Sequence, residues 1–126
     1  MTPELDKQLC EKYPLIFADR NADISQTAMC WGFECADGWY NIIDTLCKAI
    51  QNHIDQCNVS QVVAVQVKEK FGGLRFYYDG GDDYIEGLVQ MAEMMSERTC
   101  EVCGNKSMLY QTGWHKTLYE KCGQLK

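Results

Sequence analysis

The stretch that decides the fold is VVAVQVKEKFGGLRFYYD, residues 62–79. Its first half alternates with a period of two residues, as expected for a strand with one covered face. The residues predicted to point to that face are Val63, Val65 and Val67. Gly72 and Gly73 then supply the positive φ angles that a tight turn requires. The alternation resumes after them in Leu74, Phe76 and Tyr78. The stretch therefore predicts a β-hairpin.

A long amphipathic helix is predicted before this hairpin. It opens at Asp37 and Gly38 and runs to about Gln56. Its apolar residues recur at i, i+3, i+4 and i+7, the spacing of one buried helix face. They are Trp39, Ile42, Ile43, Leu46, Ile50 and Ile54.

Two shorter helices flank these elements. The first is predicted to start with a cap, at Thr2, Pro3 and Glu4. It runs to about Glu11, because the Tyr13-Pro14 pair disfavours helical backbone. The turn at residues 80–83 ends in aspartates that can cap another helix. The inner face predicted for that helix is Ile85, Leu88, Val89, Ala92 and Met95. Residues 20–27 are predicted to be irregular. The order of the elements, two helices, a hairpin and a further helix, predicts an α+β fold with helices packed on a small antiparallel sheet.

Length and composition set the protein class. The chain has 126 residues, of which 46% are hydrophobic and 11% aromatic, enough to bury a core. A net charge of −6 argues against a general polyanion binder. No run of 18 apolar residues occurs, and residues 1–10 lack the pattern of a signal peptide. We therefore expect the protein in the cytoplasm.

The charge is unevenly distributed. Residues 1–97 contain 7 basic and 16 acidic residues, whereas residues 98–126 contain 5 basic and 2 acidic residues. This change predicts an acidic α+β lobe over residues 1–97 and a distinct C-terminal segment, residues 98–126, packed on it.

The eight cysteines are numerous for a cytosolic domain, where disulfides are disfavoured. Cys10, Cys47 and Cys57 fall in or beside helical patterns, and we expect them to be small buried apolar residues. Cys30 and Cys35 form a separate pair without an assigned role.

The C-terminal cysteines carry the sharpest chemical signal. Cys100 and Cys103 are separated by two residues and are followed by Gly104, the pattern of a zinc knuckle. Cys122 lies at the distance expected of a second pair, but Tyr119 occupies its partner's position, so His115 is the nearest substitute ligand. The candidate metal ligands are therefore Cys100, Cys103, Cys122 and His115, in a small zinc-knuckle or treble-clef-like subdomain. Cys30 or Cys35 is an alternative fourth ligand. The alternative to the whole site is that Cys100 and Cys103 are free or disulfide-linked thiols that bind no metal.

Enzyme motifs are absent from the sequence. The chain has two histidines and lacks the Gly-x-Ser-x-Gly, His-Glu-x-x-His and phosphate-loop patterns, so we expect no enzymatic activity and assign no catalytic residue. The Cys100–Cys103 pair does not open a helix in a βαβ unit, as a thioredoxin-like redox pair would.

Three segments carry a resemblance to a known family. The segments are CADGWYNIID at residues 35–44, KEKFGGLRFYY at 68–78, and TCEVCG at 99–104 with the later Gly113-Trp114 and Thr117-Leu118 pairs. Together they resemble a family of small bacteriophage and prophage proteins. The resemblance covers about residues 30–122. In that family a cysteine follows the Thr-Leu pair, and a cysteine or histidine lies three residues later. Cys100, Cys103 and Cys122 match this pattern, and Tyr119 departs from it.

Two binding functions follow from these observations. The first is a zinc-stabilised interaction protein that modulates or inhibits a host or defence-system protein, for example as an anti-CRISPR inhibitor, because an acidic face can compete for a basic nucleic-acid channel. The alternative is nucleic-acid binding through the basic and aromatic C-terminal segment. The candidate partner-binding residues are Lys106, Trp114, Lys116 and Tyr77.

Overall fold

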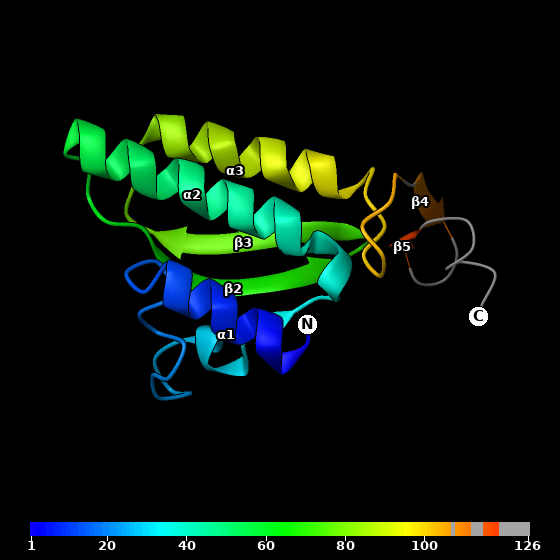
Figure 1. The fold of residues 1–126 in the computed structure, drawn as a ribbon, viewed down its shortest axis with the longest axis horizontal. Coiled ribbons are helices and arrows are strands. Elements are labelled where there is room, and N and C mark those ends of the chain that lie inside the picture. Colours follow the sequence, from blue (N-terminus) through cyan, green and yellow to red (C-terminus); the bar gives the residue numbers. More distant parts are fainter. Residues whose placement is uncertain (107, 112–114, 119–126) are drawn as a thin grey trace.

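The computed structural model describes residues 1–106, together with the strand backbones of residues 108–111 and 115–118 (Figure 1). The elements in the described residues are α1 (Pro3–Lys12), η1 (Ala28–Trp31), β1 (Phe33–Glu34), η2 (Asp37–Trp39), α2 (Tyr40–Cys57), β2 (Val63–Lys70), β3 (Gly73–Asp79), α3 (Asp83–Ser96), β4 (Met108–Gln111) and β5 (His115–Leu118). The predicted α+β class is confirmed.

The β2–β3 hairpin is present, but its turn differs from the predicted one. Lys70 pairs with Gly73, so the two turn residues are Phe71 and Gly72, at φ 54° and 83°. Both central residues of a type I′ turn need positive φ, and the twist of this turn matches that of the strands. Gly73 is therefore the first residue of β3 and not part of the turn.

A β-bulge changes which face of β2 is buried. The register shifts between Ala64 and Gln66. Ala64 and Val67 are fully buried, whereas Val63 and Val65 are only half-buried. The prediction is right for Val67 and wrong for Val63 and Val65, because the extra residue in a bulge reverses the alternation on the two sides of it. On β3 the predicted alternation holds, with Leu74 and Phe76 buried.

The sheet is mixed and not antiparallel. β1 pairs in parallel with β2, through Phe33 with Val67 and Glu34 with Lys68, and the strand order is β1-β2-β3. A strand of two residues is too short to show a two-residue period, so the sequence pattern does not reveal it.

Helix α2 follows the prediction closely. Ile43 and Ile50 are fully buried, as is Trp39 in η2, the short helix that contains the predicted start. Helix α2 ends at Cys57, and Asn58 after it has the left-handed conformation. In Figure 1, α2 and α3 run side by side along the sheet. The buried side chains form one cluster that includes residues of all three α-helices and of all three strands of this sheet.

Of the two helix caps predicted from the sequence, the one at α3 is present and the one at α1 is not. Asp82 accepts a hydrogen bond from the Ile85 amide and caps α3. Thr2 makes no side-chain cap; instead its backbone N–H donates to Asp37 at 2.7 Å. Pro3 opens α1 and Tyr13 closes it, as predicted.

Helix α3 also covers the free edge of the sheet. The Leu74 amide donates to Ser96 Oγ at 2.8 Å, and the Phe76 amide donates to Glu93 Oε2 at 3.0 Å. An uncovered edge strand invites pairing with other chains. These two side chains fix α3 beside β3 and determine which face of α3 is left outside. In the described parts of the chain, no helix combines the length and apolar character needed to cross a membrane.

A polar contact between α1 and α2 predicts how stability depends on pH. Asp44 accepts hydrogen bonds from Lys12 Nζ at 2.6 Å and from Tyr13 Oη at 2.7 Å. Burial alone would raise the pKa of Asp44, but these two bonds hold it below its ordinary value. Burial and the neighbouring Asp44 raise the pKa of Tyr13.

We expect the Asp44 contribution to be complete above the ordinary pKa of an aspartate, about 3.9, and to be lost as the pH falls towards the lower folded-state value. The Tyr13 contribution is complete below about pH 10 and is lost as the pH rises through its higher folded-state value. Urea unfolding of Asp44→Asn should therefore show a shallower decline in stability in acid than the wild type. Tyr13→Phe should do the same in alkali, and equal pH slopes in all three proteins would contradict the assignment.

Candidate functional site

The segment predicted as a zinc knuckle, residues 99–106, forms a closed turn in the structure. We call this segment the knuckle. The Gly104 amide donates to the Cys100 carbonyl at 2.9 Å, the Cys100 amide donates to Asn105 at 2.7 Å, and Thr99 bridges to Lys106. Gly104 has φ 81°. Glycine adopts this conformation without the steric cost that a side chain adds. The turn thus places the two thiols of Cys100 and Cys103 on one short loop.

The knuckle is seated on residues 36–39, which precede α2. The Trp39 indole donates to the Thr99 carbonyl at 2.9 Å, and the Gly38 amide donates to the Glu101 carbonyl at 2.6 Å. The Ala36 amide donates to Glu101 Oε2 at 3.0 Å. Glu101 is buried, and the bond from the Ala36 amide offsets part of the cost of burying its carboxylate. These three bonds define a seam between the knuckle and the lobe.

The predicted metal ligands are only partly visible in this arrangement. Cys100 is fully buried, and Cys103 is exposed. His115 lies on β5, where its backbone pairs with Gln111. Cys122 lies outside the described residues. Among the residues that the structure describes, no three histidine, cysteine or acidic side chains gather as a metal-binding group.

The remaining cysteines occupy different environments. Cys47 is buried as expected, whereas Cys10 is half-buried and Cys57 is exposed, so the prediction is wrong for Cys57. Burial, with Glu101 nearby, raises the pKa of Cys35 to about 12, so its thiol is protonated at neutral pH. Cys30 donates its S–H to the Thr27 carbonyl at 3.4 Å.

The predicted partner-binding residues do not form one described surface. Tyr77 is exposed on β3, with Lys68 Nζ 6.0 Å from its ring centre. Lys106 is exposed beside the knuckle. Lys116 pairs with Tyr110 in the backbone of β4–β5, and Trp114 lies outside the described residues.

A different surface, which the sequence pattern does not predict, lies on the outer face of α3. We call it the methionine stripe. Four of its five side chains are 53–69% exposed, and Leu88 is half-buried. They are Tyr84, Leu88, Met91, Met94 and Met95. The spacing of i, i+4, i+7, i+10 and i+11 places them along one side of the helix, the pattern of a helix-packing face. The prediction that Met95 belongs to the buried face is wrong, because Ile85, Val89 and Ala92 fill that face.

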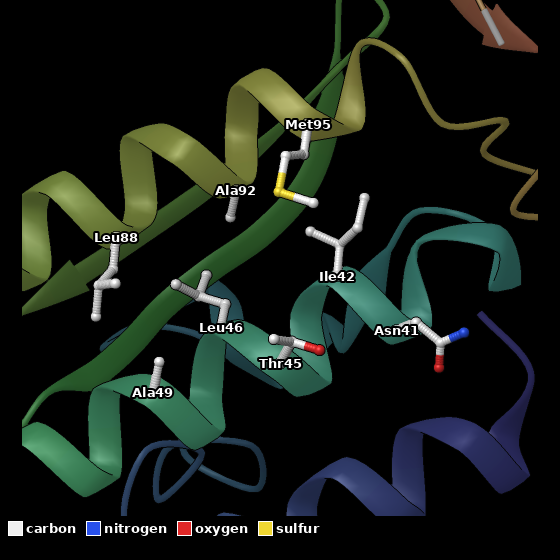
Figure 2. A pocket seen from close by; sticks show the side chains of 8 residues that line it. All are labelled: Asn41, Ile42, Thr45, Leu46, Ala49, Leu88, Ala92 and Met95. Carbon is white, nitrogen blue, oxygen red and sulfur yellow. The ribbon is translucent and has the colours of Figure 1, made fainter. Parts of the chain in front are cut away.

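The methionine stripe borders an apolar groove between α2 and α3. The groove has a volume of about 260 Å³, and Figure 2 shows Leu88 and Met95 of α3 facing Ile42 and Leu46 of α2 across it. Methionine is flexible and polarisable, and it is common on surfaces that adapt to a partner. An exposed apolar surface next to a groove is typical of a docking site.

One end of the methionine stripe is held in place. The Tyr84 ring stacks on His53 with ring centres 4.1 Å apart, and His53 Nε2 lies 2.8 Å from Asp82 Oδ2. The hydrogen bond from His53 is the largest cause that lowers the pKa of Asp82. This end of the stripe therefore presents a positioned aromatic ring.

Gly87 lies within α3 on the same face. A Cβ atom added there would meet nothing within 4 Å. Glycine inside a helix costs about 1 kcal/mol relative to alanine. Because no neighbouring atom of the described structure requires a glycine here, the position leaves space for close approach from outside.

An acidic row runs beside the methionine stripe. It consists of Asp83 and Glu86 in the first turn of α3 and of Glu97, which directly follows the helix, and all three are exposed. Helix α3 contains no basic residue, and the first one after it is Arg98. The exposed face of α3 is therefore apolar with one negatively charged border.

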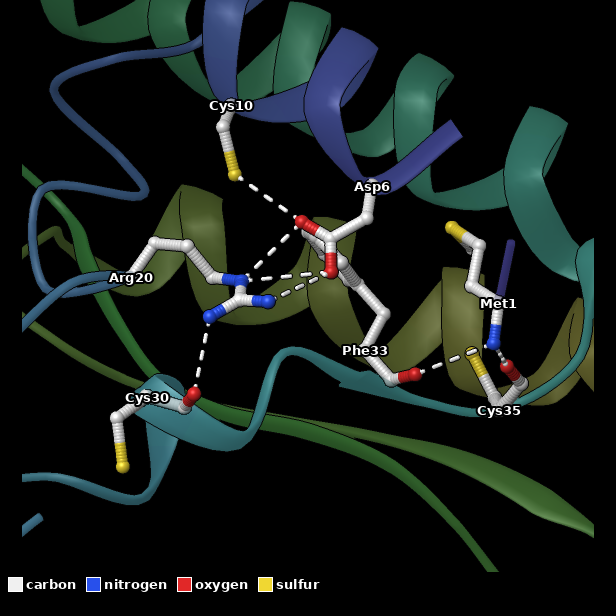
Figure 3. Close-up of polar contacts among 7 residues, drawn as sticks. All are labelled: Met1, Asp6, Cys10, Arg20, Cys30, Phe33 and Cys35. Carbon is white, nitrogen blue, oxygen red and sulfur yellow. Dashed lines mark hydrogen bonds and ion pairs between the residues drawn. The ribbon is translucent and has the colours of Figure 1, made fainter. Parts of the chain in front are cut away.

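A second pocket, of about 490 Å³, lies between α1 and η1. Figure 3 shows Arg20 bound to both carboxylate oxygens of Asp6 and to the Cys30 carbonyl at 2.9 Å. Cys10 donates to Asp6 at 3.6 Å, and burial, with Asp6, raises its pKa to about 11. The two charges are paired with each other, so the contact joins α1 to the segment that leads into β1.

Comparison of the chain with protein families, with curated proteins and with solved structures gives no match. The resemblance to bacteriophage proteins stays a hypothesis.

Proposed function

We propose that this protein is a non-enzymatic protein-binding module whose docking surface is the methionine stripe of α3. The observation that carries the proposal is the exposure of Met91, Met94 and Met95 beside an apolar groove. Burying such side chains is favourable by about 25 cal/mol per Å² of apolar surface. A partner that covers the stripe and fills the groove would gain this free energy.

Zinc has a structural role in this proposal. Cys100 and Cys103 would supply two thiolate ligands, with Cys122 and His115 as the other candidates. The metal would hold the C-terminal segment closed against the seam at residues 36–39. What supports this is the closed turn with Gly104 at positive φ, the local geometry that a knuckle needs.

The target in this proposal is a host or defence-system protein met in the host cytoplasm. That part rests on the resemblance of residues 35–44, 68–78 and 99–104 to bacteriophage proteins. No described contact favours the alternative, nucleic-acid binding through the C-terminal segment.

Selection from a library of random helix-permissive peptides tests the docking surface without knowledge of the target. We expect selected binders to lose at least about tenfold in affinity for Met91→Gln/Met94→Gln, because anchors at the centre of an interface dominate binding. Leu15→Gln/Ile24→Gln is the matched control, since these side chains are also exposed, at 57% and 60%, but lie outside α3. Binders that tolerate the stripe variant, or a selection that yields none, would overturn the proposal.

A further inference from the structure

The charge beside the methionine stripe specifies its partner more closely, an inference that rests on the proposed function. We propose that the stripe binds an amphipathic α-helix that carries Lys or Arg along one flank of its apolar face. The bound helix would lie along α3, with its apolar residues on the stripe and its basic residues against Asp83, Glu86 and Glu97.

The shape of the surface favours a helix. The stripe follows helical spacing over residues 84–95, and the groove beside it lies between two side-by-side helices. An apolar face with i, i+3, i+4 and i+7 anchors is how an amphipathic helix enters such a groove. Gly87 lies between Tyr84 and Met91, where open space lets another backbone approach closely.

The charges favour a basic flank on one side only. Along one border lie the three carboxylates of the acidic row. Along the other border the groove is lined from α2 by Asn41, Thr45 and Ala49, which carry no charge. A partner helix therefore meets negative charge on one flank and neutral groups on the other.

The same charges disfavour a second copy of this chain. If two stripes packed together, the carboxylates of both acidic rows would border one contact. In the described segment from Asp83 to Arg98, Arg98 is the only basic residue that could offset them. Like charges brought together across an interface are costly.

Three synthetic helical peptides test the inference. They share one apolar stripe and carry Lys/Arg, Gln or Glu on one flank, and their affinity is measured by fluorescence anisotropy at 50 and 300 mM NaCl. We expect the basic peptide to bind at least about tenfold more tightly than the Gln peptide at low salt, and the Glu peptide to bind most weakly. The difference should shrink at high salt because salt screens exposed charges.

Two charge variants locate the effect. Asp83→Asn/Glu86→Gln/Glu97→Gln should remove the preference for the basic peptide, whereas Glu4→Gln/Glu11→Gln/Asp23→Asn, with the same net charge, should retain it. An equal effect of both variants would mean attraction to the overall charge and would overturn the inference.

The outcomes separate the two proposals. If the three peptides bind equally and Met91→Gln/Met94→Gln abolishes binding, the docking surface stands and the basic partner is wrong. If none binds, the inference fails, and the peptide selection decides separately whether the docking surface stands. If sedimentation shows a dimer of the free protein that Met91→Gln/Met94→Gln dissociates, the occupant is a second copy and the inference fails.

Discussion

Cys103→Ser is expected to lower the melting temperature by about 10 °C, although the Cys103 side chain is exposed. Loss of an exposed thiol with no partner has little effect on stability, usually within about 0.5 kcal/mol. Loss of a zinc ligand removes metal-binding free energy that is also folding free energy. A loss of about 2–3 kcal/mol corresponds to a shift of this size for a domain of this length.

Cys57→Ser is the matched control, because Cys57 is the other exposed cysteine among the described residues. It should melt within about 2 °C of the wild type, as an exposed substitution does. Elemental analysis of protein purified without a chelator should show about one zinc per chain in the wild type and less in Cys103→Ser. Wild-type protein without metal, or equal melting of the two variants, would remove zinc from the proposed function.

The double variant Cys100→Ser/Cys103→Ser should be less stable still. Cys100 is fully buried, so part of its effect comes from placing a hydroxyl at a buried position. Cys47→Ser measures that part, since Cys47 is also fully buried.

Gly38→Ala is expected to unseat the knuckle from the lobe and to lower the free energy of unfolding by about 2–4 kcal/mol. The added Cβ would lie 2.2 Å from the Cys100 carbonyl oxygen and 2.5 Å from the Glu101 carbonyl carbon. Both atoms belong to the backbone, so no side-chain rotation relieves the clash. The knuckle must move, which breaks the seam to Glu101 and uncovers Trp39.

Two measurements check this expectation. Urea unfolding gives the loss in stability, and trypsin digestion reports the knuckle directly, because the exposed Arg98 and Lys106 bracket it. Cleavage there should be faster in Gly38→Ala. The control is Gly87→Ala, where the added methyl group meets open space. It should raise stability by about 0.5–1 kcal/mol, because alanine is the better helix former. Unaltered digestion of Gly38→Ala would mean that the seam does not hold the knuckle.

Much of the fold could be predicted from the chain because its signals are local. The apolar stripe of α2 repeats from Ile42 to Ile54, more than three turns. Tyr13-Pro14 ends α1 through a steric restriction, and Asp82 caps α3 through a bond to an amide three residues away. The alternation in β3 and the Cys100–Cys103–Gly104 spacing are equally local. The short strand β1 and the β2 bulge escaped prediction, because each is defined by pairing with another strand and leaves no periodic pattern in its own residues.

Sequence by itself determined the helices, the hairpin and the cysteine turn, since propensity, capping and periodicity act between residues a few positions apart. Only the tertiary structure decided which side of α3 faces out. The helix is apolar over more than one face, and the bonds from Leu74 and Phe76 to Ser96 and Glu93 select the face that packs on the sheet. Met91, Met94 and Met95 are exposed as a consequence. A periodic pattern records that a side chain is apolar, but the packing of neighbouring elements determines whether it is covered.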